Sequence, residues 1–343
     1  MATPGSSHVT LVRPRLNANT CMIGSASADR EGAFGLEPVD LRQAYQTAAA
    51  VHRGLPPLAE PGYRLFHVGG DAQSWIDLLA RRDTFAVAGR HSCCDLLLDG
   101  DPEVALRHLL VRAEPGVDGA PPMLRILDLQ TQLGFRFDQG DRESSAVVTG
   151  PLAVHVGRHA LVAFPGQSSE VPPELPPMMV EPTGASPYRH RPANAPPPAG
   201  PRWTHVSLYG RAPSLHEVRS ASSARSPGID HDADGPPSAR IALEKHGGGQ
   251  SVEIADAELD MGVLIGRASK CDRRFARLLD DKVSRTHLLI LRDEVETAAY
   301  DLASTNGTYL DGKRMRRFVL PDVGATLAIG LGGVKMHWHP PGG

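Results

Sequence analysis

The sequence predicts an all-β protein in which two β-sandwiches are joined by a disordered, proline-rich linker. Short apolar and β-branched runs separated by Gly, Asp and Pro fill residues 62–165 and again residues 239–340. Many short strands with turns between them are typical of sandwiches. The chain has 343 residues, enough for about two domains at roughly 150 residues each. Its 35 glycines and 30 prolines indicate long turn and linker segments.

The N-terminal segment, residues 1–61, begins with small and polar residues, and we expect most of it to be disordered. One stretch, Val39 to His52, places its apolar residues near one face before Gly54, which predicts a short helix. In the first β-rich unit, residues 62–165, the sequence also favours one helical insert from Trp75 to Ala80.

The linker comprises residues 166–238 and holds 15 of the 30 prolines. It has few aromatic or β-branched residues, so it cannot bury enough apolar surface to offset the entropy of ordering. We therefore expect a disordered connection to the second β-rich unit, residues 239–340.

Charge and hydropathy exclude several classes of protein. The 36 basic and 39 acidic residues give a net charge of −3, so no bulk nucleic-acid binding is expected. The apolar runs are far shorter than the ~18 residues that cross a bilayer, and the N-terminus lacks a signal-peptide pattern. We expect a cytoplasmic protein without a membrane span. The bias toward Arg, Ala and Pro favours a bacterial source.

Signatures of metals, cofactors and common enzymes are absent from the sequence. Two of the four cysteines, Cys93 and Cys94, are adjacent, and there is no C-x-x-C or H-E-x-x-H motif. His337 and His339 share one face of a predicted strand but have no evident third ligand. The sequence also lacks a Walker A loop, a G-x-G-x-x-G and a G-x-S-x-G motif. We expect no cofactor and no metal.

Three polar clusters stand at strand ends in residues 239–340, where functional loops of a sandwich usually lie. They are Gly266-Arg267, Ser284-Arg285-Thr286-His287 and Ser304-Thr305-Asn306-Gly307-Thr308. Two arginines, hydroxyl groups and an amide, with no acid among them, form a set of donors suited to a phosphate group.

The order of these clusters resembles the forkhead-associated (FHA) domain, an eleven-stranded β-sandwich that binds phosphothreonine peptides through its apical loops. The resemblance covers about 100 residues and includes the D-L-x-S-T-N-G-T pattern from Asp301. It implies that Arg267 and Ser284 contact the phosphate, with Thr305 beside them. Asn306 would hold the peptide main chain.

The same resemblance assigns supporting roles to other residues. Arg285 would assist phosphate binding, and Lys282 would read the residue three positions after the phosphothreonine. Gly266, His287 and Gly307 would be structural supports that shape the loops.

Residues 62–165 repeat the pattern in a degenerate form. Gly89-Arg90, Ala105-Leu106-Arg107-His108 and the segment from Asp128 to Phe135 follow in the same order. Ala105 replaces the phosphate-binding serine, and Gln132 and Leu133 replace the threonine and asparagine. We therefore expect an FHA-like module that keeps the fold without its ligand.

The sequence thus predicts a non-catalytic adaptor in Ser/Thr kinase signalling that binds a phosphothreonine-containing protein, either a kinase or its substrate. One alternative is a phosphate-independent scaffold or a subunit of a secretion or signalling complex. Another is a hydrolase with a triad of Ser284, His287 and Asp301. This triad has little support, because three residues along a strand place the serine and histidine on opposite faces.

Overall fold

The computed structural model describes residues 38–69, 72–116, 120–138, 142–168, 170–175, 205–207, 239–245, 248–292 and 296–340. The disorder expected for residues 1–37 and for most of 166–238 concerns residues outside these ranges. Within them, strands predominate over helices, which confirms the all-β prediction.

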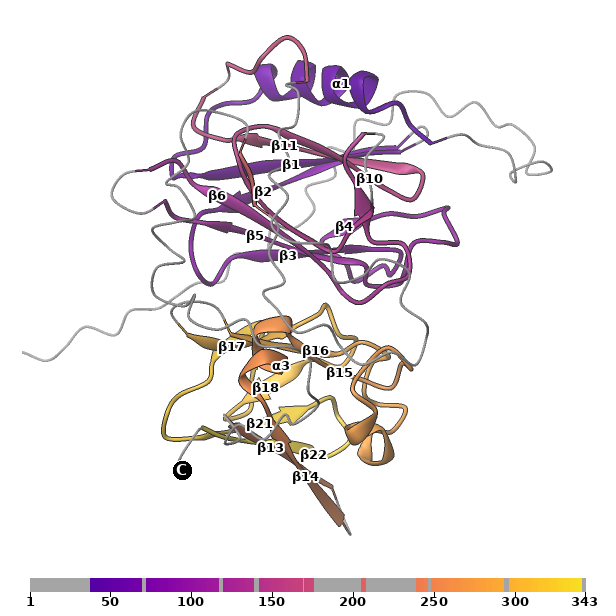
Figure 1. Ribbon diagram of the computed structural model, residues 1–343, viewed down its shortest axis with the longest axis vertical. Helices are drawn as coiled ribbons and strands as arrows, with labels where there is room; N and C mark the ends of the chain where they lie inside the picture. Colours follow the sequence, from indigo (N-terminus) through magenta and orange to yellow (C-terminus); the bar gives the residue numbers. More distant parts are fainter. Residues whose placement is uncertain are drawn as a thin grey trace, which may run out of the picture. The chain divides into compact units, whose positions relative to one another are not determined.

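The first sandwich is built from two antiparallel sheets that face each other (Figure 1). One sheet has the strand order β2-β1-β11-β10-β7-β8, and the other has the order β12-β9-β6-β5-β3-β4, in which β4 and β12 pair in parallel. Its strands are β1 (Gly62–Gly69), β2 (Ala72–Leu79), β3 (Phe85–Gly89), β4 (Leu96–Leu97), β5 (Leu109–Glu114), β6 (Met123–Asp128), β7 (Phe135–Arg136), β8 (Arg142–Glu143), β9 (Ser145–Thr149), β10 (Leu152–Val156), β11 (His159–Pro165) and β12 (His205–Ser207).

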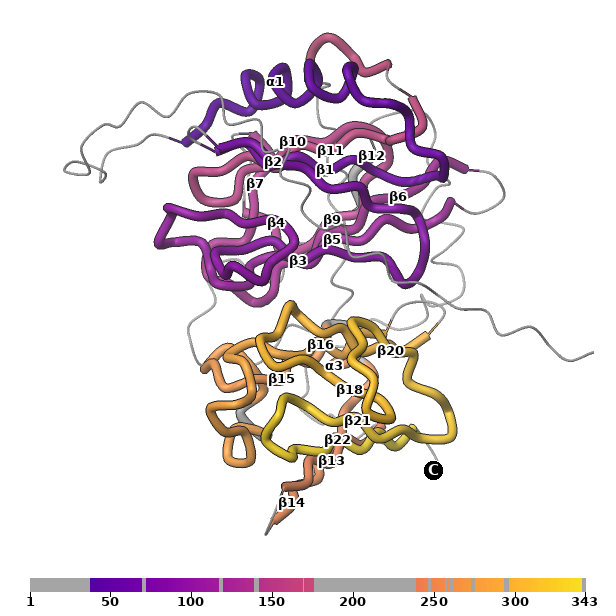
Figure 2. The backbone as a smooth tube through the Cα atoms, turned by 180° about the vertical axis from the view of Figure 1, so that it is seen from behind, coloured from indigo at the N-terminus to yellow at the C-terminus, as the bar shows by residue number. Residues whose placement is uncertain are grey.

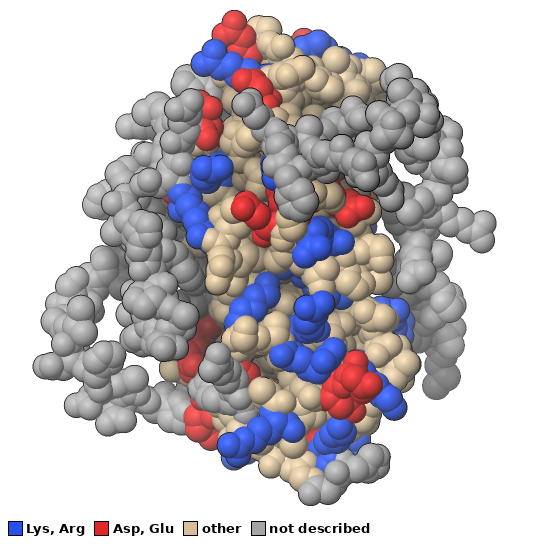
Figure 3. Space-filling view, turned by 90° about the vertical axis from the view of Figure 1, so that its right-hand side faces the viewer, with Lys and Arg blue, Asp and Glu red and all other residues tan. Residues whose placement is uncertain are grey.

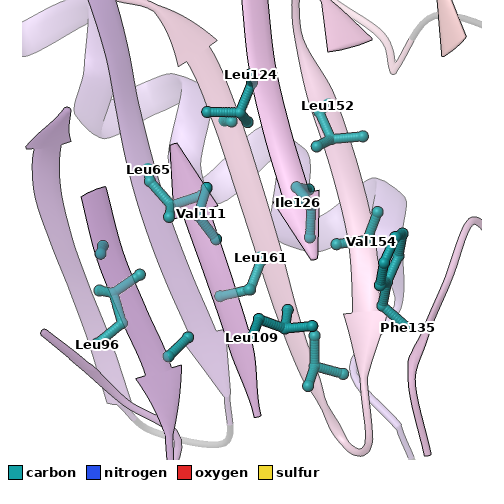
Figure 4. Packing of buried hydrophobic residues seen from close by; sticks show 14 of the residues in the cluster. Leu65, Leu96, Leu109, Val111, Leu124, Ile126, Phe135, Leu152, Val154 and Leu161 are labelled. Atoms are coloured by element: carbon teal, nitrogen blue, oxygen red, sulfur yellow. The ribbon is translucent and has the colours of Figure 1, made fainter. Parts of the chain in front are cut away.

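Apolar side chains from both sheets fill the space between them. Alternate residues of a strand point to the same face, and in β5 this places Leu109 and Val111 in the sandwich core. Figure 4 shows these two side chains together with Leu65 and Leu161 from the opposite sheet. The intervening residue of β5, Leu110, is also buried but belongs to a different apolar cluster.

Helix α1 (Leu41–Gly54) covers the outer face of the first sheet, over β1, β10 and β11 (Figures 1 and 2). The Asp40 carboxylate caps its N-terminus by accepting a 2.8 Å hydrogen bond from the Gln43 amide. On the buried face, the Tyr45 ring lies 5.2 Å from the ring of Phe164. The helix predicted from Val39 to His52 is therefore confirmed. No helix in the described ranges is both long and apolar enough to cross a bilayer.

The predicted helical insert from Trp75 to Ala80 is wrong. All of these residues except Ala80 belong to β2, which pairs with β1 along its whole length, from Gly62 opposite Leu79 to Gly69 opposite Ala72. Strand β2 is at a sheet edge, and most of its side chains are exposed. Its local sequence therefore carries little apolar alternation, and pairing with β1 outweighs the local helical preference.

The second sandwich repeats the strand order of the first. Its sheets are β14-β13-β22-β21-β18-β19 and β15-β16-β17-β20, so each strand has a counterpart in the first sandwich at the same place. Its elements are β13 (Ala239–Lys245), β14 (Gly248–Ile254), α3 (Asp256–Met261), β15 (Val263–Ile265), η2 (Arg273–Leu278), β16 (Leu288–Arg292), β17 (Thr297–Asp301), β18 (Thr308–Leu310), β19 (Lys313–Met315), β20 (Arg317–Val319), β21 (Ala325–Ile329) and β22 (Val334–His339).

The two sandwiches share a third apolar cluster and belong to one compact unit that begins at residue 38. The outer faces of β3, β5 and β6 contribute Phe85, Val87 and Leu110, among others. The outer faces of β15, β16 and β17 contribute Leu289 and Tyr300, and the rings of Phe85 and Tyr300 meet edge to face at 5.3 Å. The sequence analysis had joined the sandwiches by the linker alone; the structure adds a packed interface.

Candidate functional site

Three loops of the second sandwich meet and carry all the site residues that the sequence predicts. Gly266 and Arg267 follow β15, Lys282 to His287 precede β16, and Thr305 to Gly307 connect β17 to β18. Hydrogen bonds tie the second loop to each of the others. The Thr305 amide donates to Ser284 Oγ at 3.1 Å, and Asn306 Nδ2 donates to the carbonyl of Lys282 at 2.7 Å.

Arg267 is exposed, and a single bond fixes the course of its side chain. Its Nε donates to the carbonyl of Val283 at 2.6 Å. The terminal Nη groups have no hydrogen-bond partner among the described residues. The guanidinium is thus held next to Ser284 with two groups of donors available to a ligand.

Ser284 also has a donor available to a ligand. Its Oγ accepts the bond from the Thr305 amide, so the hydroxyl hydrogen remains available. Around it, Lys282, Arg285 and Thr305 are exposed and Asn306 is half-buried.

His287 is buried and joins two loops through both ring nitrogens. Nδ1 accepts from the Ser284 amide at 3.0 Å, so Nε2 carries the hydrogen and donates to the carbonyl of Gly307 at 3.1 Å. Neither nitrogen contacts Ser284 Oγ. The geometry therefore lacks the histidine–serine bond that the hydrolase alternative needs.

Asp301 is the main buried acceptor beneath the site. It accepts from the Ser304 amide at 2.8 Å, from Ser304 Oγ at 2.6 Å and from Thr308 Oγ1 at 2.8 Å. Arg314 adds a 2.9 Å bond from Nη2 to the carbonyl of Ser304. No separate role was predicted for Ser304 or Arg314, and Asp301 was considered only as part of the motif and of the hydrolase triad. The sequence signal for Asp301 was its position seven residues before Thr308, at the start of the D-L-x-S-T-N-G-T pattern.

Two glycines are required by close approaches of other groups. A Cβ at Gly266 would lie 2.3 Å from the carbonyl oxygen of Arg285, so a side chain there would separate the first two loops. Gly307 has a φ of 78°, and a Cβ would lie 2.5 Å from Arg314 Nε.

The charged groups nearest the loops are mostly basic. Asp280 is the acid closest to Lys282 in sequence with a described partner: it accepts from Lys245 Nζ at 2.8 Å and from the Lys282 amide at 3.0 Å. The bond from Lys245 lowers the pKa of the Asp280 carboxyl below its usual range. On the face of the protein in Figure 3, Lys and Arg side chains lie among Asp and Glu side chains.

The first sandwich keeps the framework of these loops without the ligand groups. Arg90 Nε donates to the carbonyl of Val104 at 2.8 Å, as Arg267 does to Val283. His108 accepts from the Ala105 amide at 3.1 Å and donates to Gly134 at 2.8 Å. Ala105 has no hydroxyl, so the first sandwich keeps the bonds that shape the loops but lacks the donor that Ser284 provides in the second.

Buried histidines give the folded protein a defined pH dependence. Burial lowers the pKa of His67, His108 and His287 from 6.5 to about 4. Between these values the unfolded chain binds protons that the folded chain does not, so the free energy of unfolding falls as the pH decreases. We expect a loss of several kcal/mol between about pH 6.5 and 4, at ~1.4 kcal/mol per pKa unit.

Urea titrations at pH 7.5, 6 and 5 measure this loss, and calorimetry in two buffers of different ionisation enthalpy gives the protons taken up on unfolding. A free energy of unfolding that stays constant from pH 7 to 5 would contradict the expectation.

Comparisons with known proteins found one matching family model and several similar solved structures. A family model described as the FHA domain matches residues 263–330. No curated protein matches the chain significantly. Similar solved structures include the FHA-1 domain of Rv1747 from Mycobacterium tuberculosis, at 23% identity over 30% of this chain and 97% of that chain, with a TM-score of 0.24.

Two further structures were solved as complexes. The FhaA FHA domain, in complex with the intracellular domain of Rv3910, is 26% identical over 30% of this chain and 100% of that chain, with a TM-score of 0.24. The MEK1 FHA domain, in complex with the HOP1 pThr318 peptide, is 14% identical over 29% of this chain and 95% of that chain, with a TM-score of 0.24. The family match extends from β15 to β21, so this part of the second sandwich matches the FHA domain.

Proposed function

We propose that the second sandwich binds phosphothreonine peptides and that the chain is a non-catalytic adaptor in Ser/Thr kinase signalling. The observation that carries the proposal is the juxtaposition of Arg267 and Ser284 with Thr305 and Asn306 on loops that are bonded to one another. In this proposal residues 239–340 are the binding module, and residues 62–165 are a degenerate copy.

The donors suit a phosphate group in number and charge. A phosphothreonine carries about −1.5 to −2 charges near neutral pH and three acceptor oxygens. The Nη groups of Arg267 can bind two of these oxygens as a fork, and the Ser284 hydroxyl can donate to the third. Asn306 Nδ2 donates to the Lys282 carbonyl. In this proposal the Asn306 amide also contacts the peptide main chain, and Arg285 adds positive charge.

The proposed partner is a phosphothreonine-containing protein, either a Ser/Thr kinase or a substrate of one, in the cytoplasm of a bacterium. Calorimetry of the full chain with peptides selected from a degenerate phosphothreonine library tests the binding. We expect micromolar dissociation constants, about −8 kcal/mol. Equal binding of the phosphorylated and unphosphorylated forms of the selected peptide would refute the proposal in favour of a phosphate-independent scaffold.

Lys282 is proposed to favour an acidic residue three positions after the phosphothreonine. Its side chain is exposed, so the preference should be modest, ~0.2–1 kcal/mol, and should fade at high salt. In a Lys282→Glu variant, peptides with a basic residue at that position should become the preferred ones. Competition binding with a matched acidic and basic peptide pair measures the ranking.

Arg240→Glu makes a similar change of charge at an exposed position on β13 and should leave the ranking unaltered. A Lys282→Glu variant that still prefers the acidic peptide would assign the reading to another side chain.

A further inference from the structure

We infer that the peptide-binding loops of the second sandwich depend on the first sandwich, and that Arg107 is the positioning residue that links them. The part of this inference that is tested by peptide binding rests on the proposed function. It concerns a residue of the degenerate module, which the sequence analysis treated only as part of a lost motif.

Arg107 reaches from the first sandwich to the loop that carries Thr305. Its Nε donates to the carbonyl of Leu302 at 2.5 Å, and its Nη2 donates to the carbonyl of Ala303 at 2.7 Å. The side chain is buried, with 3% of the residue exposed. Ser304, Thr305 and Asn306 follow directly, so the two bonds fix the backbone where the loop leaves β17.

The backbone at this point needs an external partner. Ala303 has a φ of 53°, in the left-handed region that non-glycine residues rarely adopt. The carbonyls of Leu302 and Ala303 lie where the chain turns away from the sheet. A buried carbonyl without a partner costs about 1–3 kcal/mol, and the Arg107 guanidinium satisfies both carbonyls at once.

A second bond set ties the Arg267 loop to the first sandwich. Lys270, three residues after Arg267, donates from Nζ to the carbonyl of Leu129 at 2.7 Å and to the carbonyl of Arg107 at 3.3 Å. Leu129 and Leu302 are counterparts in the two repeats, each preceding a residue with positive φ, Gln130 and Ala303. Two of the three site loops, those of Arg267 and Thr305, are therefore anchored across the interface.

Apolar side chains cover the surface of the second sandwich that meets the first. Strands β16 and β17 are apolar on both faces: Leu288 and Ile290 belong to the sandwich core, while Leu289, Leu291 and Tyr300 belong to the shared cluster. A sheet with two apolar faces must be covered on both, since large exposed apolar patches are rare on soluble monomers.

Polar bonds complete the same interface. The buried Arg112 donates from Nη1 to the Tyr300 hydroxyl at 2.6 Å. At the rim, both Nη groups of Arg316 pair with the Asp95 carboxylate, at 2.8 and 2.6 Å. These bonds set the register between the two faces, which the apolar contacts alone would leave variable.

Comparison of the two repeats shows that the first sandwich supplies an arginine where the second has a threonine. Arg107 corresponds to Thr286, which is buried within the second sandwich. The first sandwich thus has Ala105 in place of the ligand-binding serine and, two residues later, an arginine that bonds to its neighbour's loop. The positive charge of Arg107 also contributes to lowering the pKa of His287 beneath that loop, after the larger effect of burial.

The test compares Arg107→Met with Arg142→Met in the full chain. Arg142 is the matched control, because its Nη2 donates to the carbonyl of Thr131 at 3.0 Å within the first sandwich, at the counterpart of Ser304. We expect Arg107→Met to weaken phosphothreonine-peptide binding roughly 2- to 30-fold, the range for residues that act through a network without touching the ligand. Arg142→Met should leave the affinity unchanged.

A readout without peptide separates positioning from general stability. Amide NMR resonances of residues 303–307 should shift and broaden in Arg107→Met and remain in place in Arg142→Met. Arg107→Lys retains the positive charge and a donor to the loop, so it should recover part of the affinity. If the melting temperature shows that Arg107→Met does not fold, Arg107→Lys replaces it as the test variant.

Each outcome has a distinct meaning. Unchanged affinity together with unchanged amide resonances in a folded Arg107 variant would overturn the inference. If the wild-type chain binds no phosphothreonine peptide, the proposed function fails, and the amide resonances alone then decide whether Arg107 positions the loop.

Discussion

Replacing Arg267 by alanine is expected to weaken phosphothreonine-peptide binding by about 2–5 kcal/mol, roughly 30- to 5,000-fold. The guanidinium is held by one bond to Val283, so its terminal groups can meet the phosphate without losing other partners. Truncation leaves the phosphate next to Ser284 without its counter-charge. Arg267→Lys should fall between wild type and alanine, because an ammonium keeps the charge but loses the fork geometry.

Calorimetry with one selected peptide measures these affinities. The matched control is Arg90→Ala, which removes the equivalent arginine of the first sandwich and its bond to Val104. It should leave the affinity unaltered if only the second sandwich binds. An Arg267→Ala variant with wild-type affinity would contradict the assignment of the phosphate site. A loss of affinity in Arg90→Ala would point to a phosphate site in the degenerate module.

Replacing Asp301 by alanine is expected to reduce the free energy of unfolding by about 3–6 kcal/mol. The carboxylate is buried and accepts from three donors, the Ser304 amide and the hydroxyls of Ser304 and Thr308. Each buried donor left without a partner costs about 1–3 kcal/mol. Urea denaturation of the full chain measures the loss. Peptide affinity should also fall, since Ser304 precedes the loop residues that bind.

Asp128→Ala is the control for this variant. Asp128 accepts from the amide and the hydroxyl of Thr131 in the first sandwich, at the position that corresponds to Asp301. Phe135 replaces the threonine at 308, so the bond from the Thr308 hydroxyl has no counterpart there and the loss should be smaller. Peptide affinity should change less than in Asp301→Ala. Equal effects of both variants on binding would show that Asp301 acts through global stability rather than through its loop.

Most strands of both sandwiches could be predicted from the sequence because they depend on local patterns. Alternating apolar residues between turns specify strands, and one amphipathic stretch before Gly54 specifies α1. The three polar clusters could be found in the same way, since strand ends place loop residues at the edge of a sandwich. Their order resembles the FHA domain, and that resemblance implied that Arg267, Ser284, Thr305 and Asn306 come together.

Edge strand β2 could not be predicted in this way. Its residues have no strong alternation, and their extended form depends on the hydrogen bonds that β1 offers along the hairpin. A segment with a weak local preference adopts the conformation in which a neighbouring strand bonds to its backbone. Which strand is the neighbour depends on how the whole sheet assembles.

The sequence by itself determined the fold class, the duplication and the choice of candidate site residues, because each follows from residue types at short spacing along the chain. Only the tertiary structure decided that the sandwiches share an apolar interface and that Arg107 bonds to the loop of Thr305, 198 positions later. The run from Leu288 to Leu291 is apolar at every position, but the sequence does not identify what covers the outer face of the sheet. Contacts between residues so far apart in the sequence depend on how two folded surfaces fit together. That fit is fixed only after both sandwiches have formed.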